Sequence, residues 1–239
     1  MFIVRLKKKS LRLVLAVSML VVLGVRLWAE SKPTIEEVEG VDLSVLSGRT
    51  IAIDPGHGGI DSGARYNGQI EKDITLELAV SLAQVLKTYG ANVVLTRDCD
   101  IDYYTRGKGG KRNDLLKRVS IINQSGADLF VSLHTNAIRG KEWFGAEVYY
   151  NPKLQQNIDI AEIVQQSLRN FPPGNKRQAR KDLNILILKN IDVPGILVET
   201  GFLSNPREAD LLANPTYQKN LVEHIAKALA YHFSHSVAR

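Results

Sequence analysis

Two histidines and two glutamates in this chain of 239 residues stand where they could do chemistry together. His57 lies in a glycine-rich turn within Ile51 to Ala64 (IAIDPGHGGIDSGA), directly after an apolar run. His134 and Glu199 also end apolar runs, in the segments SLHTNA and GILVETG, and Glu71 stands at the start of a helical pattern. Two imidazoles and a carboxylate, with one position left for water, are the ligands of a catalytic zinc site.

Each of these residues also has a structural explanation. A lone histidine after a strand is more often a hydrogen-bonded structural group than a ligand. Glu71 could be a first-turn acid that the helix dipole favours, and Glu199 could cap a loop. Four such residues converging on one edge of a sheet share no structural explanation. A metal site and an acid/base site both stay open at this point, with a second carboxylate as the proton carrier.

Alternating strands and helices must position these side chains. Apolar runs predict strands, and stripes at helical spacing predict helices. This alternation predicts a single α/β domain with a mostly parallel twisted sheet of about six strands and helices on both faces. Because ligands collect at the carboxyl ends of parallel strands, we expect the four residues to meet at that edge. The predicted strands are 50–54, 91–96, 128–133, 145–150, 184–188 and 195–199, and the predicted helices are 72–89, 113–124, 156–170 and 217–233.

The basic charge of the chain is concentrated at its N-terminus. The formal net charge is +6, from 31 bases and 25 acids, and six of the bases but no acid lie in residues 1–29. The remainder is neutral, which excludes the electrostatic surface of a nucleic-acid binder. A basic region followed by an apolar run from Leu13 to Val25 is typical of a signal peptide or short N-terminal membrane anchor, so we expect an exported, extracytoplasmic protein. Residues 30–47 are expected to be a linker, and 48–236 the catalytic domain.

Several other functions lack their motifs. The single cysteine, Cys99, cannot form an intrachain disulfide, and its acidic neighbours argue against a nucleophile. Gly56-His57-Gly58 lacks the third glycine of a dinucleotide-binding motif, because position 61 is aspartate, and no GxSxG motif is present. The long polar loop 98–112 is typical of a functional segment. Its basic residues could bind carboxylates of an anionic polymer or could simply be solvated.

Four blocks in order resemble one enzyme family. The blocks are DPGHGGIDSGA, EKDITLELA, SLHTNA and GILVETGFLSNPREADLL, and they resemble the zinc-dependent N-acetylmuramoyl-L-alanine amidases of bacterial cell walls (amidase type 3). The resemblance covers Gly48 to Phe233. The leader, the segment LKRVSIIN and the lack of a wall-binding repeat domain look most like the germination-specific amidases of spore-forming bacteria.

The resemblance implies a site and a reaction. It implies that His57, Glu71 and His134 bind one zinc ion, that Glu199 is the catalytic carboxylate and that Asn136 lines the substrate site. The expected reaction is hydrolysis of the amide between N-acetylmuramic acid and L-alanine in peptidoglycan. In the spore subgroup this prepares muramic acid for lactam formation by a deacetylase.

Expected partners and location also follow from the resemblance. We expect the peptidoglycan substrate, an activating or anchoring protein, and membrane contact only through the N-terminal segment, in the cell wall or the spore intermembrane space. The alternatives are a zinc carboxypeptidase or other peptidase acting on stem peptides, and a wall-binding module without catalysis.

Overall fold

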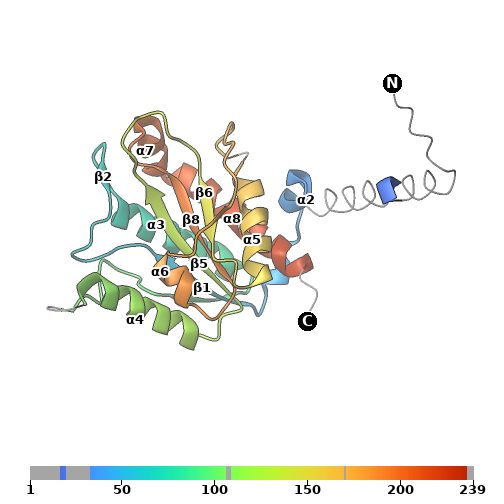
Figure 1. Cartoon of the computed structure of the whole chain (residues 1–239), viewed down its shortest axis with the longest axis horizontal. Helices are drawn as coiled ribbons and strands as arrows, with labels where there is room; N and C mark the ends of the chain where they lie inside the picture. Colours follow the sequence, from blue (N-terminus) through green and yellow to red (C-terminus); the bar gives the residue numbers. More distant parts are fainter. Residues whose placement is uncertain (1–16, 20–32, 106–108, 170, 236–239) are drawn as a thin grey trace, which may run out of the picture. The chain divides into compact units, whose positions relative to one another are not determined.

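A six-stranded sheet forms the centre of the fold, seen in a computed structural model that describes residues 17–19, 33–105, 109–169 and 171–235 (Figure 1). The strands lie in the order β4-β1-β5-β8-β6-β7. The first four run parallel to one another, whereas β6 is antiparallel to β8, and β7 follows the direction of β6. The predicted mostly parallel sheet is therefore confirmed. The strands are β1 (Thr50–Pro55), β4 (Asn92–Leu95), β5 (Leu129–Asn136), β6 (Glu147–Tyr150), β7 (Arg180–Lys181) and β8 (Gly195–Phe202).

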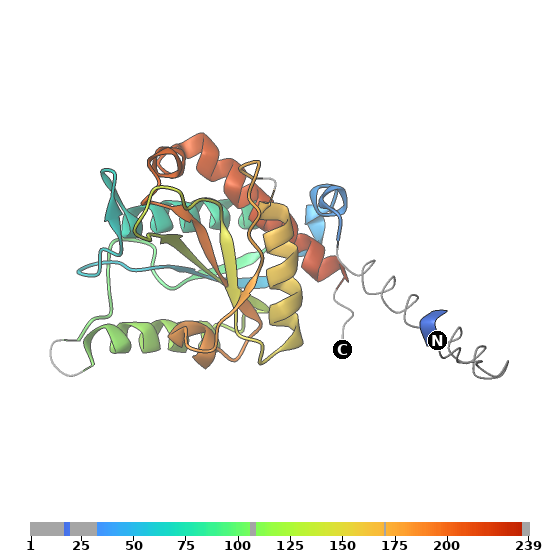
Figure 2. The ribbon, with the colours of Figure 1, turned by 45° about the horizontal axis from the view of Figure 1, so that its top comes forward.

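Helices cover both faces of this sheet, as predicted. Figure 2 shows α3 and α8 on one side of the sheet and α4 and α6 on the other. Because side chains alternate along a strand, β1 sends Ile51 and Ile53 into the larger core with α3, α5 and α8, and Ala52 into the smaller core with α4 and α6. The helices of these layers are α3 (Glu71–Thr88), α4 (Gly110–Gln124), α5 (Gln155–Leu168), α6 (Leu186–Asn190) and α8 (Pro215–His235).

The segment predicted to be a linker, 30–47, is folded over its described part. It contains α2 (Ile35–Glu39) and the 3₁₀ helix η1 (Leu43–Leu46), and the side chains of Val38 and Leu46 are fully buried in the larger core. Glu39 of α2 also pairs with Lys227 of α8, at 2.6 Å. Elements of one turn show no helical stripe in a sequence, so the scattered apolar residues looked like a linker. The compact unit begins at Ile35 rather than at Gly48.

The predicted strand 184–188 is wrong, because this apolar run forms the helix α6. Asp182 accepts hydrogen bonds from the backbone N–H groups of Asn184 and Ile185, which turns the chain into the helix. Ile187 and Leu188 of α6 then pack on the smaller core. A short apolar run cannot be assigned to strand or helix by periodicity alone. The sixth strand is instead β7, which pairs with β6.

Two smaller elements flank the carboxyl end of the sheet. β2 (Arg65–Tyr66) and β3 (Gln69–Ile70) form an antiparallel hairpin directly before α3. The short helix α7 (Pro206–Leu212) follows β8, and Asn205 caps it by accepting hydrogen bonds from Arg207 and Glu208. A capping asparagine followed by proline favours the start of a helix at this point.

The predicted leader lies almost wholly outside the described residues, which omit 1–16 and 20–32. Among the described residues, no helix is long and apolar enough to cross a membrane. The signal peptide or membrane anchor therefore stays a prediction.

Candidate metal centre and active site

The three predicted metal ligands meet at the carboxyl ends of β1 and β5. His57 follows β1, Glu71 is the first residue of α3, and His134 lies near the end of β5. Glu71 Oε1 lies 3.2 Å from His57 Nε2 and 3.1 Å from His134 Nδ1. One ligand atom from each residue lies within 4.8 Å of the other two. The fold thus brings together side chains from three separate elements.

The geometry of these atoms fits a metal ion. Ligand atoms about 2.0–2.1 Å from a tetrahedral zinc ion stand roughly 3.3 Å apart, close to the two distances above. Two imidazoles and one carboxylate are also the donor set of catalytic zinc sites with an open fourth position. Next to this group, Oε2 of Glu199 is buried and has no hydrogen-bond partner among the described residues. The residues present therefore fit a bound metal beside an available carboxylate.

Electrostatics keep Glu71 in the form that a metal requires. Burial alone would raise the pKa of Glu71, but hydrogen bonds and charge from His134 and His57 hold it well below its ordinary value. Burial alone would lower the pKa of His134, but Glu71 and then Glu199 raise it. Glu71 Oε1 also accepts a hydrogen bond from the backbone N–H of Thr135, at 3.0 Å. Metal ligands must be deprotonated, and Glu71 meets that condition.

Glu199 lies on the strand next to His134. The two residues are direct partners in the pairing of β5 with β8, so their side chains share one face of the sheet. Burial, together with the charges of Glu71 and Glu147, raises the pKa of Glu199 to about 7. A carboxylate with such a pKa can accept and return a proton near neutral pH.

Glycines in the motif leave the space that the ligands occupy. A Cβ at Gly56 would collide with the imidazole ring of His134. A Cβ at Gly63 would come within 2.5 Å of Glu71 Oε2, and Gly63 has a φ of +63° that favours glycine. His57 itself has a positive φ of 62°. Such a backbone conformation persists only when the surrounding structure holds it.

Two buried arginines, which sequence reasoning missed, hold the turn that carries His57. Arg118 of α4 donates hydrogen bonds to the backbone carbonyls of Pro55 (2.7 Å) and His57 (2.6 Å), and it pairs with Asp54 at 2.9 Å. Arg97 donates to the carbonyls of Pro55 and Gly56. The exposed fraction of Arg118 is 1% and that of Arg97 is 2%. The sequence could have indicated the burial of Arg118, because a charged residue within the apolar stripe of a helix faces the core.

Residues 98–105 of the predicted loop bind the same turn from outside. Asp100 and Asp102 accept hydrogen bonds from the backbone N–H groups of Gly59 and Ile60, at 2.7 and 2.8 Å. This part of the loop is therefore structural.

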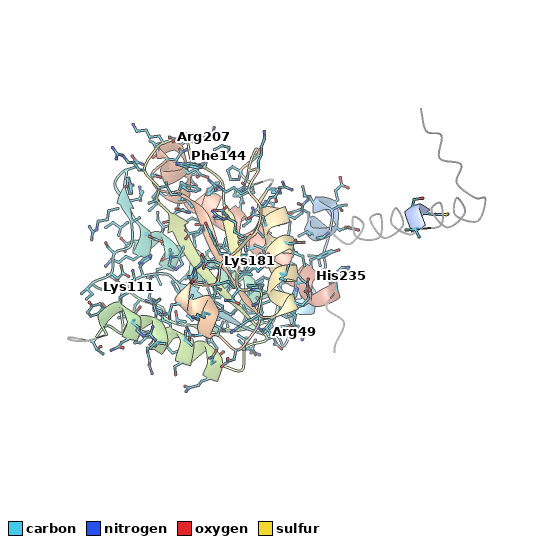
Figure 3. The ribbon with its side chains drawn as sticks, viewed as in Figure 1. Arg49, Lys111, Phe144, Lys181, Arg207 and His235 are labelled. Atoms are coloured by element: carbon cyan, nitrogen blue, oxygen red, sulfur yellow. The ribbon has the colours of Figure 1, made fainter. Side chains whose placement is uncertain are left out.

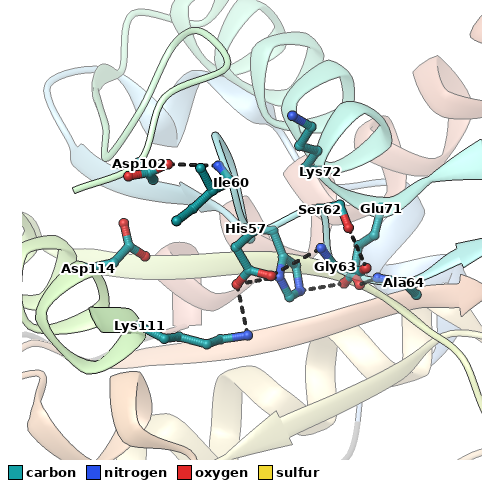
Figure 4. A network of polar contacts seen from close by, with 12 residues as sticks. His57, Ile60, Ser62, Gly63, Ala64, Glu71, Lys72, Asp102, Lys111 and Asp114 are labelled. Atoms are coloured by element: carbon teal, nitrogen blue, oxygen red, sulfur yellow. Dashed lines mark hydrogen bonds and ion pairs between the residues drawn. The ribbon is translucent and has the colours of Figure 1, made fainter. Parts of the chain in front are cut away.

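A charged contact joins the start of α4 to the histidine. Lys111 pairs with Asp61 at 2.8 Å, and the carboxylate of Asp61 lies 3.0 Å from Nδ1 of His57. Figure 4 labels Lys111 and His57 and marks ion pairs with dashed lines. The carboxylate lies outside the direction of a good hydrogen bond, so its contact with Nδ1 is electrostatic. Burial alone would raise the pKa of Asp61, but Lys111 and His57 lower it to about 2.

Asn136, the predicted substrate residue, lies on β5 two residues beyond His134. The pairing of β5 with β8 shifts between these two residues, and Asn136 is paired with Phe202. Asn136 is half-buried, and its backbone carbonyl accepts a hydrogen bond from Leu203. Its part in substrate binding stays a prediction.

A parallel α/β sheet with histidines and glutamates gathered at its carboxyl edge defines the class of α/β enzymes with a candidate metal centre. A family profile described as N-acetylmuramoyl-L-alanine amidase matches residues 51–231. The chain belongs to this family, as the sequence blocks indicated, and it is a peptidoglycan N-acetylmuramoyl-L-alanine amidase.

Individual relatives agree with this assignment. The chain is 41% identical over 193 residues to the germination-specific N-acetylmuramoyl-L-alanine amidase of Bacillus subtilis, covering 79% of this chain and 81% of that protein. It is similar to the CwlD amidase of Clostridioides difficile, solved in complex with the GerS lipoprotein, with a TM-score of 0.72 and 31% identity over 78% of this chain and 99% of that one. A solved N-acetylmuramoyl-L-alanine amidase of Clostridium difficile 630 has a TM-score of 0.70 and 30% identity over 80% of this chain and 100% of that one.

Proposed function

We propose that this amidase works with one zinc ion held by His57, Glu71 and His134, and that Glu199 is its catalytic carboxylate. The observation that carries the proposal is the meeting of the three donor atoms within 4.8 Å beside the unpartnered Oε2 of Glu199. A zinc ion at these ligands would supply the Lewis acidity that polarises an amide carbonyl and makes a water molecule more acidic.

Glu199 then carries out the two proton transfers of the reaction. Its carboxylate takes a proton from the attacking water and passes that proton to the nitrogen of L-alanine, which cannot leave as an amide anion. In the metal-free protein its pKa is raised to about 7, so this carboxylate takes up and releases a proton near neutral pH. Glu71 stays ionised, as a zinc ligand must be.

The biological setting belongs to the same proposal. Similarity to the germination-specific amidase of Bacillus subtilis supports a role in the spore cortex, where removal of the stem peptide prepares muramic acid for lactam formation by a deacetylase. Such a role requires export, which the basic and apolar leader in residues 1–29 supports. The complex of the CwlD amidase with the GerS lipoprotein supports a partner protein for this chain also.

Digestion of purified peptidoglycan tests the reaction and the role of Glu199. The wild-type protein with zinc is expected to release new amine termini that are L-alanine, whereas release of D-alanine would identify a carboxypeptidase instead. Glu199→Gln is expected to lose hydrolysis by about 10²-fold or more while it retains bound zinc, because the amide cannot shuttle the proton. The matched control Glu36→Gln, at an exposed position of α2, is expected to keep full activity.

A further inference from the structure

A cluster of four side chains lies on the side of Glu199 that faces β6 and β7. Glu147 of β6 accepts a hydrogen bond from the hydroxyl of Tyr149, at 2.8 Å, and pairs with Arg177 at 3.3 Å and with Arg180 at 3.7 Å. Glu147 is buried, whereas the side chain of Arg180 is 61% exposed. We refer to Glu147, Tyr149, Arg177 and Arg180 as the Glu147 cluster.

The strand register places this cluster next to the candidate catalytic carboxylate. Glu147 is the direct partner of Glu199 in the antiparallel pairing of β6 with β8, so their Cα atoms stand about 5 Å apart and their side chains share one face. Tyr149 shares that face and is the direct partner of Arg180 on β7. His134, Glu199 and Glu147 therefore follow one another across the sheet from the metal centre, and Arg180 lies on the next strand in register with Tyr149.

The two arginines of the cluster differ in how firmly they are held. Arg177 donates a hydrogen bond to the carbonyl of Phe144 at 2.8 Å, and its guanidinium lies 4.4 Å from the ring centre of Phe202. Arg180 lies over the ring of Tyr149 at 5.6 Å, and its 3.7 Å separation from Glu147 is too long for a hydrogen bond. Among the described residues, the guanidinium of Arg180 has no hydrogen-bond acceptor.

Charge in the cluster is also unbalanced. Two guanidiniums share the single carboxylate of Glu147, and neither pairs with a second carboxylate among the described residues. One positive charge is left over, and it belongs to the more exposed and less constrained group, Arg180. An arginine with free donors presents a planar fork that matches a carboxylate.

We propose that Arg180 forms a subsite for a free carboxylate of the stem peptide, with Tyr149 and Glu147 orienting its guanidinium. This inference rests on the proposed function, because it uses Glu199 to locate the scissile bond. The ligand class is an acidic stem peptide, bound through a free carboxylate. The subsite selects stem peptides with free carboxylates over peptides in which those carboxylates are amidated.

Removal of Arg180 leaves the rest of the cluster intact. Glu147 keeps its hydrogen bond from Tyr149 and its ion pair with Arg177, so Arg180→Ala does not leave a buried charge unpaired. Lys181, labelled in Figure 3, supplies the matched control. It is the other residue of β7 and is exposed as well, but it pairs with Tyr150, so its side chain leaves the opposite face of the sheet.

The test measures binding apart from turnover. A muramoyl peptide with free stem carboxylates and the same peptide with amidated carboxylates are titrated calorimetrically into zinc-loaded Glu199→Gln protein. Adding Arg180→Ala is expected to weaken binding of the acidic peptide about tenfold and to leave binding of the amidated peptide unchanged. Lys181→Ala is expected to change neither, and Arg180→Lys is expected to restore part of the loss.

Kinetics on the otherwise wild-type enzyme give a second readout. Arg180→Ala is expected to raise KM for the acidic peptide about tenfold with little change in kcat. Equal losses with both peptides, or equal losses in Arg180→Ala and Lys181→Ala, would overturn the subsite. Failure of the wild-type enzyme to release L-alanine would instead count against the proposed function, and the binding comparison would still decide the subsite.

Discussion

Glu199 lies where burial opposes its negative charge, and this affects stability as well as catalysis. Its pKa rises from an ordinary value of 4.5 to about 7 in the folded protein. Between these two values the folded state binds a proton more tightly than the unfolded state does, so stability falls as the pH rises. The metal-free protein thus carries a stability cost at neutral pH that is absent at pH 4.5.

This cost predicts a pH dependence that Glu199→Gln removes. In the presence of a chelator, the urea midpoint of the wild-type protein is expected to fall between pH 5 and pH 7.5 more than that of the variant. The raised pKa of His134 also reduces stability as the pH rises above about 6.5, but Glu71, its main cause, is kept in the variant, and the smaller contribution of Glu199 to it disappears together with Glu199 itself. Parallel pH profiles of the two midpoints would contradict the assignment.

Substitution of Arg118 is expected to lower the free energy of unfolding strongly, although Arg118 does not contact the side chain of a metal ligand. Arg118→Met leaves the carboxylate of Asp54 buried with only its hydroxyl donors, and removal of one partner of a buried ion pair costs about 3–5 kcal/mol. It also frees the carbonyl of His57. Chemical denaturation measures the loss, and Lys117→Met, at the exposed neighbouring position, is expected to stay within about 0.5 kcal/mol of the wild type. A small loss for Arg118→Met would mean that Asp54 is not charged.

Among the elements, η1 shows that residues ahead of β1 are part of the domain. Leu46 is fully buried against the larger core. Leu46→Ala is therefore expected to lower the free energy of unfolding by about 2–4 kcal/mol. The same substitution at Leu183, which is 55% exposed, is the control and is expected to change little. Similar values for the two variants would show that η1 is only loosely attached.

Elements with many turns or continuous apolar runs could be predicted from the sequence. Helix α3 and strand β5 have apolar patterns that are long enough to be assigned to one element type. Their predicted bounds differ from the observed ones by a few residues. Short elements could not be predicted, because their structure depends on tertiary contacts. The apolar run 184–188 became α6 through one side chain, Asp182, and α2 is held by contacts with a helix near the other end of the chain.

In the candidate site also, some features could be predicted from the sequence and others could not. The meeting of His57, His134 and Glu199 follows from the rule that parallel strands end at one edge, so the sequence alone located it. The hydrogen bonds from Arg97 to the turn, and the position of Arg180 two strands away from Glu199, depend on loop paths and on strand pairing. No spacing in the sequence predicts such contacts.

At the scale of the whole molecule, the candidate metal centre connects elements that are distant in the chain. Its ligands come from the end of β1, the first turn of α3 and the end of β5, and the two strands are adjacent in the sheet. A ligand that binds only the folded state stabilises the entire cooperative unit. Zinc should therefore act on global unfolding, and not only on the turn that contains His57.

Thermal unfolding with and without zinc tests this connection. At a free zinc concentration 100 times the dissociation constant, the gain is about 2.7 kcal/mol, which raises Tm by roughly 5–10 °C in a domain of this size. His134→Ala is expected to abolish the shift, because it removes one of three ligands. Glu199→Gln is expected to keep the shift while losing hydrolysis, since Glu199 is not one of the three clustered donors. A full shift in His134→Ala would place the zinc at other residues, and loss of the shift in Glu199→Gln would make Glu199 a ligand rather than the proton carrier.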